Sequence, residues 1–337
     1  MAVVFVEGFD HISAAQSTSK GWSAALNAVV AGRLGGQACR TASTGLAGPS
    51  HALPSSYSSV IAGFAFQSSG IAATVDFFAL RSGGTNVVRL RLSLVSGSNV
   101  LQVLNAAGTV LATGTTPILA SVWYYIEVKV VVSATVGTVE VRLNGLGTTE
   151  ASATGVNTGA SNVDTIILGS LISTAGIFDD MYVCDTSGSA PTNDFLGDYR
   201  VETLITTAEG ANTAWTANTG TKAGAVDDAT SYDSDTTYIL DSTPGDRETF
   251  TIASLAVGTG TVFAVQTNLV ARKDDAGART IAPVIRTGGV NYDGTTTAGL
   301  STSYLDYTQL YDRLDPAGSA WSIATVNAME VGVKEVA

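Results

Sequence analysis

A chain of 337 residues is longer than one ordinary hydrophobic core supports, so the sequence predicts two domains. Its formal net charge of −12 and pI of about 4.5 exclude a function that depends on attracting a nucleic-acid backbone. Charged residues make up only 14%, and 36 glycines accompany 7 prolines, a composition typical of many strands joined by tight turns.

Alternation of apolar and polar residues predicts strands throughout the first half of the chain. They are an opening strand that ends at Asp10 and strands over 62–67, 75–80, 88–94 and 101–103. A longer hairpin is predicted over 121–145, where Asn144-Gly145 favours a tight turn because both positions need positive φ. Trp22 is expected in a loop that closes one end of the sheet. Short strands at this spacing favour a β-sandwich.

The stretch from Gly176 to Val201 is predicted to end one domain and begin the next. A strand is expected over 177–183, interrupted by the charged pair Asp179-Asp180, and residues 187–191 then break regular structure. The predicted fold is therefore all-β, with two tandem antiparallel β-sandwich domains of the jelly-roll kind. The first covers residues 1–187, a linker covers 188–199, and the second domain covers 200–337.

The second half contains a further set of predicted strands, over 201–205, 237–240, 249–252, 261–271 and 280–286. The charged residues 272–277 are the predicted tip of a hairpin that joins the last two. Pro283 places the return strand at the edge of a sheet, because proline cannot donate to a ladder. A turn over 315–318, a helical turn over 322–328 and a final strand over 329–336 complete the domain.

No arrangement of residues in the sequence predicts catalysis. A retaining glycosidase needs two carboxyl groups about 5 Å apart, whereas Glu127 and Glu140 each stand alone and are expected to be solvated charges on an outer face. His11 and His51 have no serine or cysteine partner nearby in the sequence, and the G-x-S-x-G pattern is missing. We therefore predict no catalytic residues and no enzymatic activity.

Two groups of aspartates have the oxygen chemistry that calcium prefers: Asp179-Asp180, and the cluster Asp227, Asp228, Asp233 and Asp235. Neither group has the spacing of an EF-hand loop, and aspartate is also a common turn-building residue. We favour turn-building aspartates and predict neither a metal nor a cofactor.

The two cysteines, Cys39 and Cys184, match no metal-ligand spacing. A disulfide between them is one interpretation, but two buried free thiols are favoured, because free cysteine packs as a small apolar side chain. The N-terminus lacks a basic region followed by a long apolar run, and no stretch reaches the ~20 apolar residues of a membrane helix. We expect a chain that is made in a cytoplasm, stays soluble and does not insert into a membrane.

The first half resembles the concanavalin A-like (laminin-G-like) jelly-roll family. The resemblance rests on SVWYYIEVKVVVSATVGTVEVRLNG at 121–145, on the closing-strand pattern Phe178-Asp179-Asp180-Met181-Tyr182-Val183, and on the Phe9-Asp10 pair. It covers roughly Ala2 to Asp185 and implies a jelly-roll sandwich. The family includes lectins and glucanases, but the alternating acids of its glucanases, E-x-D-x-E, are missing here.

The second half resembles a class of structural proteins of tailed-bacteriophage virions. The residues that carry this are DDMYVCDTSGSAPTNDFLGDYRVETL from Asp179, Trp215, Val226-Asp227-Asp228, Asp235 to Ile239, ARKDDAGAR, Thr287-Gly288-Gly289 and DPAGSAWSIATVNAMEVGVK. The resemblance implies a structural component of the particle in the tail, the baseplate or fibre region, or as capsid decoration. It assigns no catalytic residues, and it implies other virion proteins and further copies of the chain, as a homo-oligomer, as partners.

Three functional hypotheses follow. The first is a non-enzymatic virion structural protein that acts through protein–protein contacts. The alternative is a glycan-binding module for adsorption to a host surface, with Trp22, Trp215 or Tyr292 as exposed aromatic contacts. A third, a glucanase-like hydrolase, requires two carboxyl groups within ~5.5 Å on a concave face.

Overall fold

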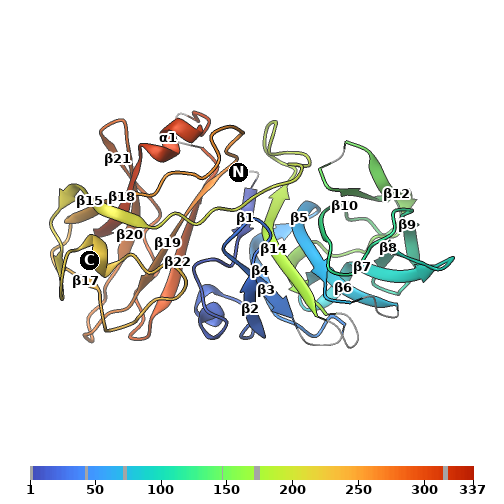
Figure 1. Cartoon of the computed structure of the whole chain (residues 1–337), viewed down its shortest axis with the longest axis horizontal. Helices are drawn as coiled ribbons and strands as arrows, with labels where there is room; N and C mark the ends of the chain where they lie inside the picture. Colours follow the sequence, from blue (N-terminus) through green and yellow to red (C-terminus); the bar gives the residue numbers. More distant parts are fainter. Residues whose placement is uncertain (1–2, 42–44, 71–73, 146, 171–174, 314–317) are drawn as a thin grey trace. The chain divides into compact units, whose positions relative to one another are not determined.

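The computed structural model describes the chain except for residues 1–2, 42–44, 71–73, 146, 171–174 and 314–317. The described chain forms two compact units, Met1–Val201 and Glu202–Ala337, and both are built almost entirely from antiparallel strands (Figure 1). The predicted all-β class is confirmed. No helix among the described residues is both long and apolar enough to cross a membrane.

The first unit contains two antiparallel sheets. One has the order β12-β11-β10-β5-β14-β3-β2, with β1 also paired to β14, and the other has the order β4-β13-β6-β7-β8-β9. The elements are β1 (Val3–Glu7), η1 (Ala15–Lys20), β2 (Ala28–Ala31), β3 (Gln37–Thr41), β4 (Ser50–Tyr57), β5 (Ser59–Ser68), β6 (Val75–Ser82), β7 (Thr85–Val95), β8 (Ser98–Asn105), β9 (Val110–Thr113), β10 (Trp123–Val131), β11 (Gly137–Leu143), β12 (Thr149–Val156), β13 (Val163–Leu168) and β14 (Gly176–Asp185).

The two sheets pack face to face through aromatic side chains. Phe64 and Phe66 of β5 meet Phe78 and Phe77 of β6 at ring distances of 4.5 and 4.4 Å. The pairing of β6 with β7 shifts its register between Asp76 and Phe78. This shift interrupts the alternation of buried and exposed side chains, and the neighbouring Phe77 and Phe78 are both buried. Phe178 of β14 completes this group of rings, so the sandwich predicted from alternation is the observed core.

The Asn144-Gly145 turn is observed as predicted between β11 and β12. The φ angles of the two residues are 55° and 63°, in the left-handed region that asparagine and glycine tolerate best. A side chain at position 145 would approach the backbone nitrogen of Asp198 to 2.6 Å, so glycine here also permits a close approach by another segment. The turn therefore serves both the hairpin and the packing of residues near Asp198.

The residues predicted to form a linker belong to the first unit. The boundary between the units lies after Val201, and residues 186–201, named here the crossing segment, run over the outer face of the larger sheet. The strand predicted over 201–205 is also not formed, since β15 begins at Thr206. The strand prediction was wrong, because alternation of apolar and polar residues does not show whether a segment finds a strand to pair with.

The second unit is smaller and has a five-stranded sheet of order β15-β18-β23-β20-β21 and two two-stranded ribbons, β16–β17 and β19–β22. The elements are β15 (Thr206–Thr213), β16 (Thr216–Ala217), η2 (Ala223–Ala225), β17 (Ile239–Leu240), β18 (Arg247–Ile252), β19 (Val265–Ala271), β20 (Ile281–Thr287), β21 (Val290–Asp293), β22 (Leu305–Tyr311), α1 (Ile323–Asn327) and β23 (Glu330–Glu335).

The core of the second unit lies between the five-stranded sheet, the β19–β22 ribbon and α1. It contains Ile252, Ile285, Trp321 and Val326, and Val265 packs against it from the ribbon. The predicted helical turn and final strand are confirmed, and a capping box between Ser322 and Thr325 begins the helix. The turn predicted at 315–318 falls mainly outside the described residues.

Strand pairing in the second unit differs from the predicted hairpin. β19 pairs with β22, whereas β20 pairs with β23 and β21. Pro283 consequently lies in an inner strand and not at an edge. The sheet accommodates the proline because the neighbouring strand β21 ends at Asp293. Beyond Asp293, only the N–H of Gly294 donates to the Pro283 carbonyl, at 2.7 Å.

Candidate functional site

Glu127 lies on the outer face of β10, but it is not the solvated charge that the sequence predicts. It is only 1% exposed, because the crossing segment covers it. The hydroxyl of Tyr182 and the backbone N–H of Gly197 both donate to its carboxylate, the latter at 2.9 Å. Burial raises the pKa of Glu127, although these hydrogen bonds oppose the shift. The carboxylate fastens the crossing segment to the sheet and has no open space for a substrate.

A bulge in β14 explains the Asp179-Asp180 pair. Asp180 has a φ of 50°, and the register with β5 shifts between Asp179 and Tyr182, so both carboxylates leave the regular strand pattern. Asp179 accepts a hydrogen bond from the backbone N–H of Arg33 at 2.7 Å. Asp180 accepts from the Arg33 guanidinium at 2.9 Å and from the N–H of Val201 at 2.8 Å.

Arg33 links this pair to the crossing segment. Its guanidinium also bonds to Asp198 and to the carbonyl oxygen of Tyr199, the latter at 2.7 Å, and lies 5.1 Å from the centre of the Tyr125 ring. The carboxylate oxygens considered for calcium therefore receive hydrogen bonds from the chain itself. Among the described residues, no group of three or more His, Cys, Asp or Glu side chains is arranged to hold a metal ion.

A second buried polar cluster in the first unit consists of Glu7, His11, Lys20 and Trp22. Glu7 and Lys20 form an ion pair of 3.0 Å whose side chains are 0% and 3% exposed. The ammonium group also lies 2.7 Å from Nε2 of His11, and the indole N–H of Trp22 points to the Glu7 carboxylate at 3.4 Å. No pattern in the sequence predicts this cluster, because its members are separated by up to fifteen residues in the chain.

We expect His11 to make the chain less stable in mildly acidic solution. Burial, helped by the charge of Lys20, lowers the pKa of His11 from 6.5 to about 4, so the unfolded chain takes up this proton before the folded chain. Stability therefore falls as the pH decreases from 6.5 to about 4, by about 3 kcal/mol. Urea unfolding at both ends of this range should show a smaller loss for His11→Gln than for the wild-type chain.

Other groups titrate in the same range, so the difference between the two chains is the informative quantity. The pKa of His51 is also lowered by burial, whereas burial and the Asp180 charge raise the pKa of Asp179 to about 8, which favours the folded chain at low pH. Both groups are present in the variant. Equal losses in the two chains would contradict the assignment to His11.

The cysteines are two free thiols, both buried, as the favoured interpretation predicts. Cys39 lies opposite Phe178 in the ladder, while Cys184 lies opposite Val3. Burial raises the pKa of both thiols, so neither is a reactive thiolate.

The aspartates of the second unit shape the loop between η2 and β17. The Asp233 carboxylate accepts from the N–H and hydroxyl groups of Thr237 at 3.1 and 2.8 Å, and its own N–H donates to Asp228 at 3.3 Å. Turn-building, the favoured interpretation, is confirmed for these two residues. Asp235 differs, because it projects from the loop and bonds to Arg272 and Tyr304 at 2.8 Å each.

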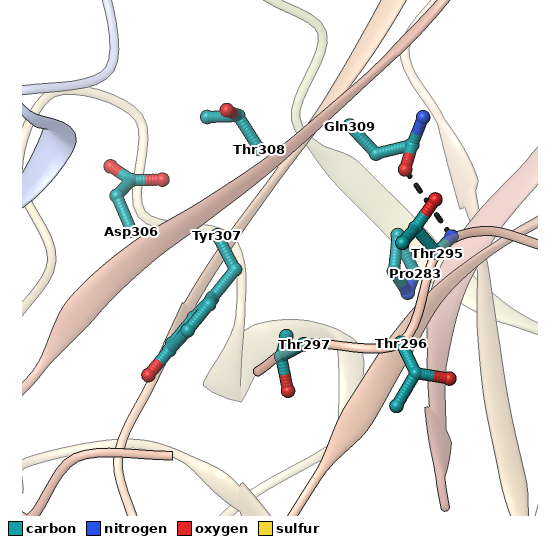
Figure 2. A pocket seen from close by; sticks show the side chains of 8 residues that line it. All are labelled: Pro283, Thr295, Thr296, Thr297, Asp306, Tyr307, Thr308 and Gln309. Atoms are coloured by element: carbon teal, nitrogen blue, oxygen red, sulfur yellow. Dashed lines mark hydrogen bonds between the residues drawn. The ribbon is translucent and has the colours of Figure 1, made fainter. Parts of the chain in front are cut away.

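A cavity of about 390 Å³ lies in the second unit between β20, the segment after β21, and β22 (Figure 2). It is lined by Pro283, Thr295, Thr296, Thr297, Asp306, Tyr307, Thr308 and Gln309. Strand alternation places Tyr307 and Gln309 on one side of β22, and Figure 2 shows Asp306 and Thr308 on the other. On the side of Tyr307, the lining therefore combines one aromatic ring with hydroxyl and amide groups.

Pro283 helps to create this cavity. Beyond Gly294 the chain leaves β20, and it returns where the N–H of Thr297 donates to the carbonyl of Ile281 at 2.8 Å. Gln309 fixes the separated segment, since its side-chain oxygen accepts from the N–H of Thr295 at 3.2 Å (Figure 2). The Tyr307 hydroxyl accepts from the N–H of Ser301 at 3.3 Å, which holds the ring in place. The site is thus preformed by backbone contacts.

The aromatic residues predicted to contact a glycan lie elsewhere. Trp22 is 2% exposed and packs against Phe5 and Phe9, so its prediction as an exposed contact was wrong. Trp215 and Tyr292 are half-buried, and neither lines the cavity. Sequence reasoning missed Tyr307 and Gln309, because an alternating strand does not reveal which neighbouring segment its outer residues will meet.

No protein-family model matches the chain, and no curated protein matches it either. Among solved structures, it is similar to the Emp46p carbohydrate recognition domain, at 10% identity over 52% of this chain and 94% of that one, with a TM-score of 0.36. The lectin UEA-II complexed with galactose is similar at 10% identity over 53% and 98%, with a TM-score of 0.32. An endo-β-1,4-glucuronan lyase from the fungus Trichoderma reesei is similar at 11% over 49% and 93%, also with a TM-score of 0.32.

Carbohydrate-binding domains and a polysaccharide-cleaving enzyme are thus both among the similar structures, and none of these three points to a bacteriophage particle. The similarities are too distant to assign a function to this chain.

Proposed function

We propose that this protein is a non-enzymatic glycan-binding protein whose site is the cavity beside Tyr307. The observation that carries the proposal is the mixed lining of that cavity, one ring among hydroxyl and amide groups. A sugar ring has an apolar face and a hydroxylated edge, so it needs an aromatic surface and hydrogen-bonding groups at the same place. The lining of the cavity supplies both.

The carboxylates of the first unit support a role without catalysis. Hydrolysis of a glycosidic bond needs an acid and a second carboxylate on opposite sides of the bond, with space for the sugar between them. Glu127, Asp179 and Asp180 are buried, and each accepts hydrogen bonds from the chain itself. Because these carboxylates are buried and occupied by internal hydrogen bonds, they favour binding over turnover.

Replacement of Tyr307 by alanine should remove glycan binding while leaving the fold intact. Native electrophoresis in gels that contain glycogen, xylan, galactomannan, hydroxyethylcellulose or glycol chitin measures binding as retardation of the protein. We expect at least one polymer to retard the wild-type chain, and Tyr307→Ala to bind that polymer at least tenfold more weakly, because loss of the ring removes the stacking surface.

Two variants serve as controls. Tyr307→Phe keeps the ring and should still bind, whereas Tyr292→Ala removes a half-buried tyrosine outside the cavity and should behave as wild type. Absence of retardation in every polymer, together with no signal on an array of microbial glycans, would overturn the proposal. So would full binding by Tyr307→Ala.

A second candidate function, a structural component of a bacteriophage virion, is favoured by two exposed leucines on the first unit. Leu94 and Leu119 are 59% and 56% exposed. Leu94 pairs with Asn99, whose carbonyl accepts from the N–H of Ile118 at 2.7 Å, so the two leucines lie near one another. A surface of this kind suits burial against neighbouring copies or other particle proteins. This role, with the virion as location, agrees with the sequence resemblance of the second half.

Purified particles test this second candidate directly. Mass spectrometry should detect the chain in particles freed of host protein, and cryo-electron microscopy should show density for both units on the tail, the fibres or the capsid exterior. Particles without the chain would refute the structural role and leave the glycan-binding proposal standing.

A further inference from the structure

Tyr232 and Tyr304 form a half-buried aromatic corner in the second unit. Their ring centres are 5.7 Å apart with an interplanar angle of 40°. Arg272 lies 5.3 Å from the centre of the Tyr304 ring, and Tyr304 donates to the backbone carbonyl of Ser234 at 3.0 Å. These contacts fix both half-buried rings in place.

Polar groups surround the corner and are themselves held in place. The side chain of Asp235 is 64% exposed, and its Oδ1 atom accepts from both Arg272 and Tyr304. Arg272 also donates to the carbonyl of Lys273 at 3.3 Å. Asp228 and Asp233 fold the loop that carries Tyr232, so the arrangement is preformed from two separate segments. An aromatic surface with a fixed polar rim is the same chemistry as that of the cavity.

The corner and the cavity are joined by a short piece of chain. Tyr304 precedes β22, and Tyr307 lies within it, so their Cα atoms are separated by at most about 10 Å. The Tyr307 hydroxyl bonds to the loop at Ser301, on the same piece of chain. This upper limit lies within the reach of a short oligosaccharide.

We infer that the ligand is a neutral polysaccharide, of which one sugar occupies the cavity and a further sugar stacks at the corner of Tyr232 and Tyr304. This inference rests on the proposed function. The net charge of −12 and the exposed Asp235 carboxylate disfavour an acidic polymer, because like charges repel at the surface. A chain of several sugars therefore binds more tightly than one or two.

The inference is tested with oligosaccharides of one to six units, prepared from the polymer that retards the wild-type chain and titrated by calorimetry. We expect wild-type affinity to rise with length. Tyr232→Leu should bind the six-unit chain about tenfold more weakly and the disaccharide unchanged. Arg272→Ala, which removes the cation that fixes Tyr304, should show the same pattern. Tyr232→Phe keeps the ring and should bind as wild type, and thermal unfolding checks the fold of each variant.

The possible outcomes separate this inference from the proposed function. If the wild-type chain is retarded by no polymer, the proposed function fails and the inference fails with it. If the wild-type chain binds but Tyr232→Leu and Arg272→Ala have the same affinity as wild type at every oligosaccharide length, the cavity remains the proposed site. The second sugar site at Tyr232 and Tyr304 is then refuted. Equal weakening at all lengths would also refute a separate subsite, as would tight binding of pectate or alginate in place of neutral polymers.

Discussion

Replacement of Glu7 by glutamine should lower the free energy of unfolding of the first unit by about 3–5 kcal/mol. The substitution leaves the Lys20 ammonium buried without its carboxylate, next to a His11 ring that is neutral at pH 7. It also weakens the acceptor for the backbone N–H of Phe9, which donates to Glu7 at 2.8 Å. Urea unfolding followed by tryptophan fluorescence measures the loss.

The double variant Glu7→Gln with Lys20→Met shows whether charge is the cause. With both charges removed, no unpaired ion remains in the core, so much of the lost stability should return. An exposed ion pair provides the comparison: Asp275→Asn, which removes the partner of Arg279 at the surface, should change the free energy of unfolding far less than Glu7→Gln. A Glu7→Gln chain within about 1 kcal/mol of wild type would refute the importance of the buried pair.

Replacement of Arg33 by alanine should release the crossing segment and destabilise the first unit by about 3 kcal/mol. The Arg33 side chain is 9% exposed, and its loss leaves the buried carboxylate of Asp180 without its cation. The same group holds Asp198 and the carbonyl of Tyr199, so residues 186–201 lose their main attachment. Chymotrypsin should then cut near Phe195 and Tyr199 at least tenfold faster than in the wild-type chain.

A second contact of the crossing segment gives a graded control. Arg142 lies 4.0 Å from the centre of the Phe195 ring but is 26% exposed, so Arg142→Ala should accelerate cleavage much less than Arg33→Ala. Arg33→Lys keeps the positive charge but loses the several N–H donors of the guanidinium group. Its rate of cleavage should therefore lie between those of the wild-type chain and Arg33→Ala. Unchanged cleavage in Arg33→Ala would show that other contacts hold the segment.

Several elements could be predicted because their causes are local. Alternation along 123–131 sets which side chains of β10 face the core, Asn144-Gly145 satisfies a turn that needs two positive φ angles, and Ser322 caps a helix three residues before its partner Thr325. The same local patterns identify the strand of the Asp179-Asp180 pair but not the bulge that turns both carboxylates toward Arg33.

The candidate site could not be predicted, because it depends on partners distant in the chain. Tyr307 alternates as any strand residue does, and its importance comes from Pro283 and the segment 295–297 beside it. The pairing of β19 with β22 rather than β20 could not be predicted either, because several strands of the second unit have the same alternating pattern.

The amino-acid sequence by itself determined the all-β class, the negative net charge that disfavours nucleic acid, and part of the first unit's strands, namely β1, β5 to β8, β10, β11 and β14. Only the tertiary structure decided that residues 186–201 cover Glu127, that Lys20 lies buried against Glu7, and that a cavity opens next to Tyr307. The physical reason is that a strand period of two residues sets the direction of each side chain. What lies against the outward side depends on contacts across the whole fold.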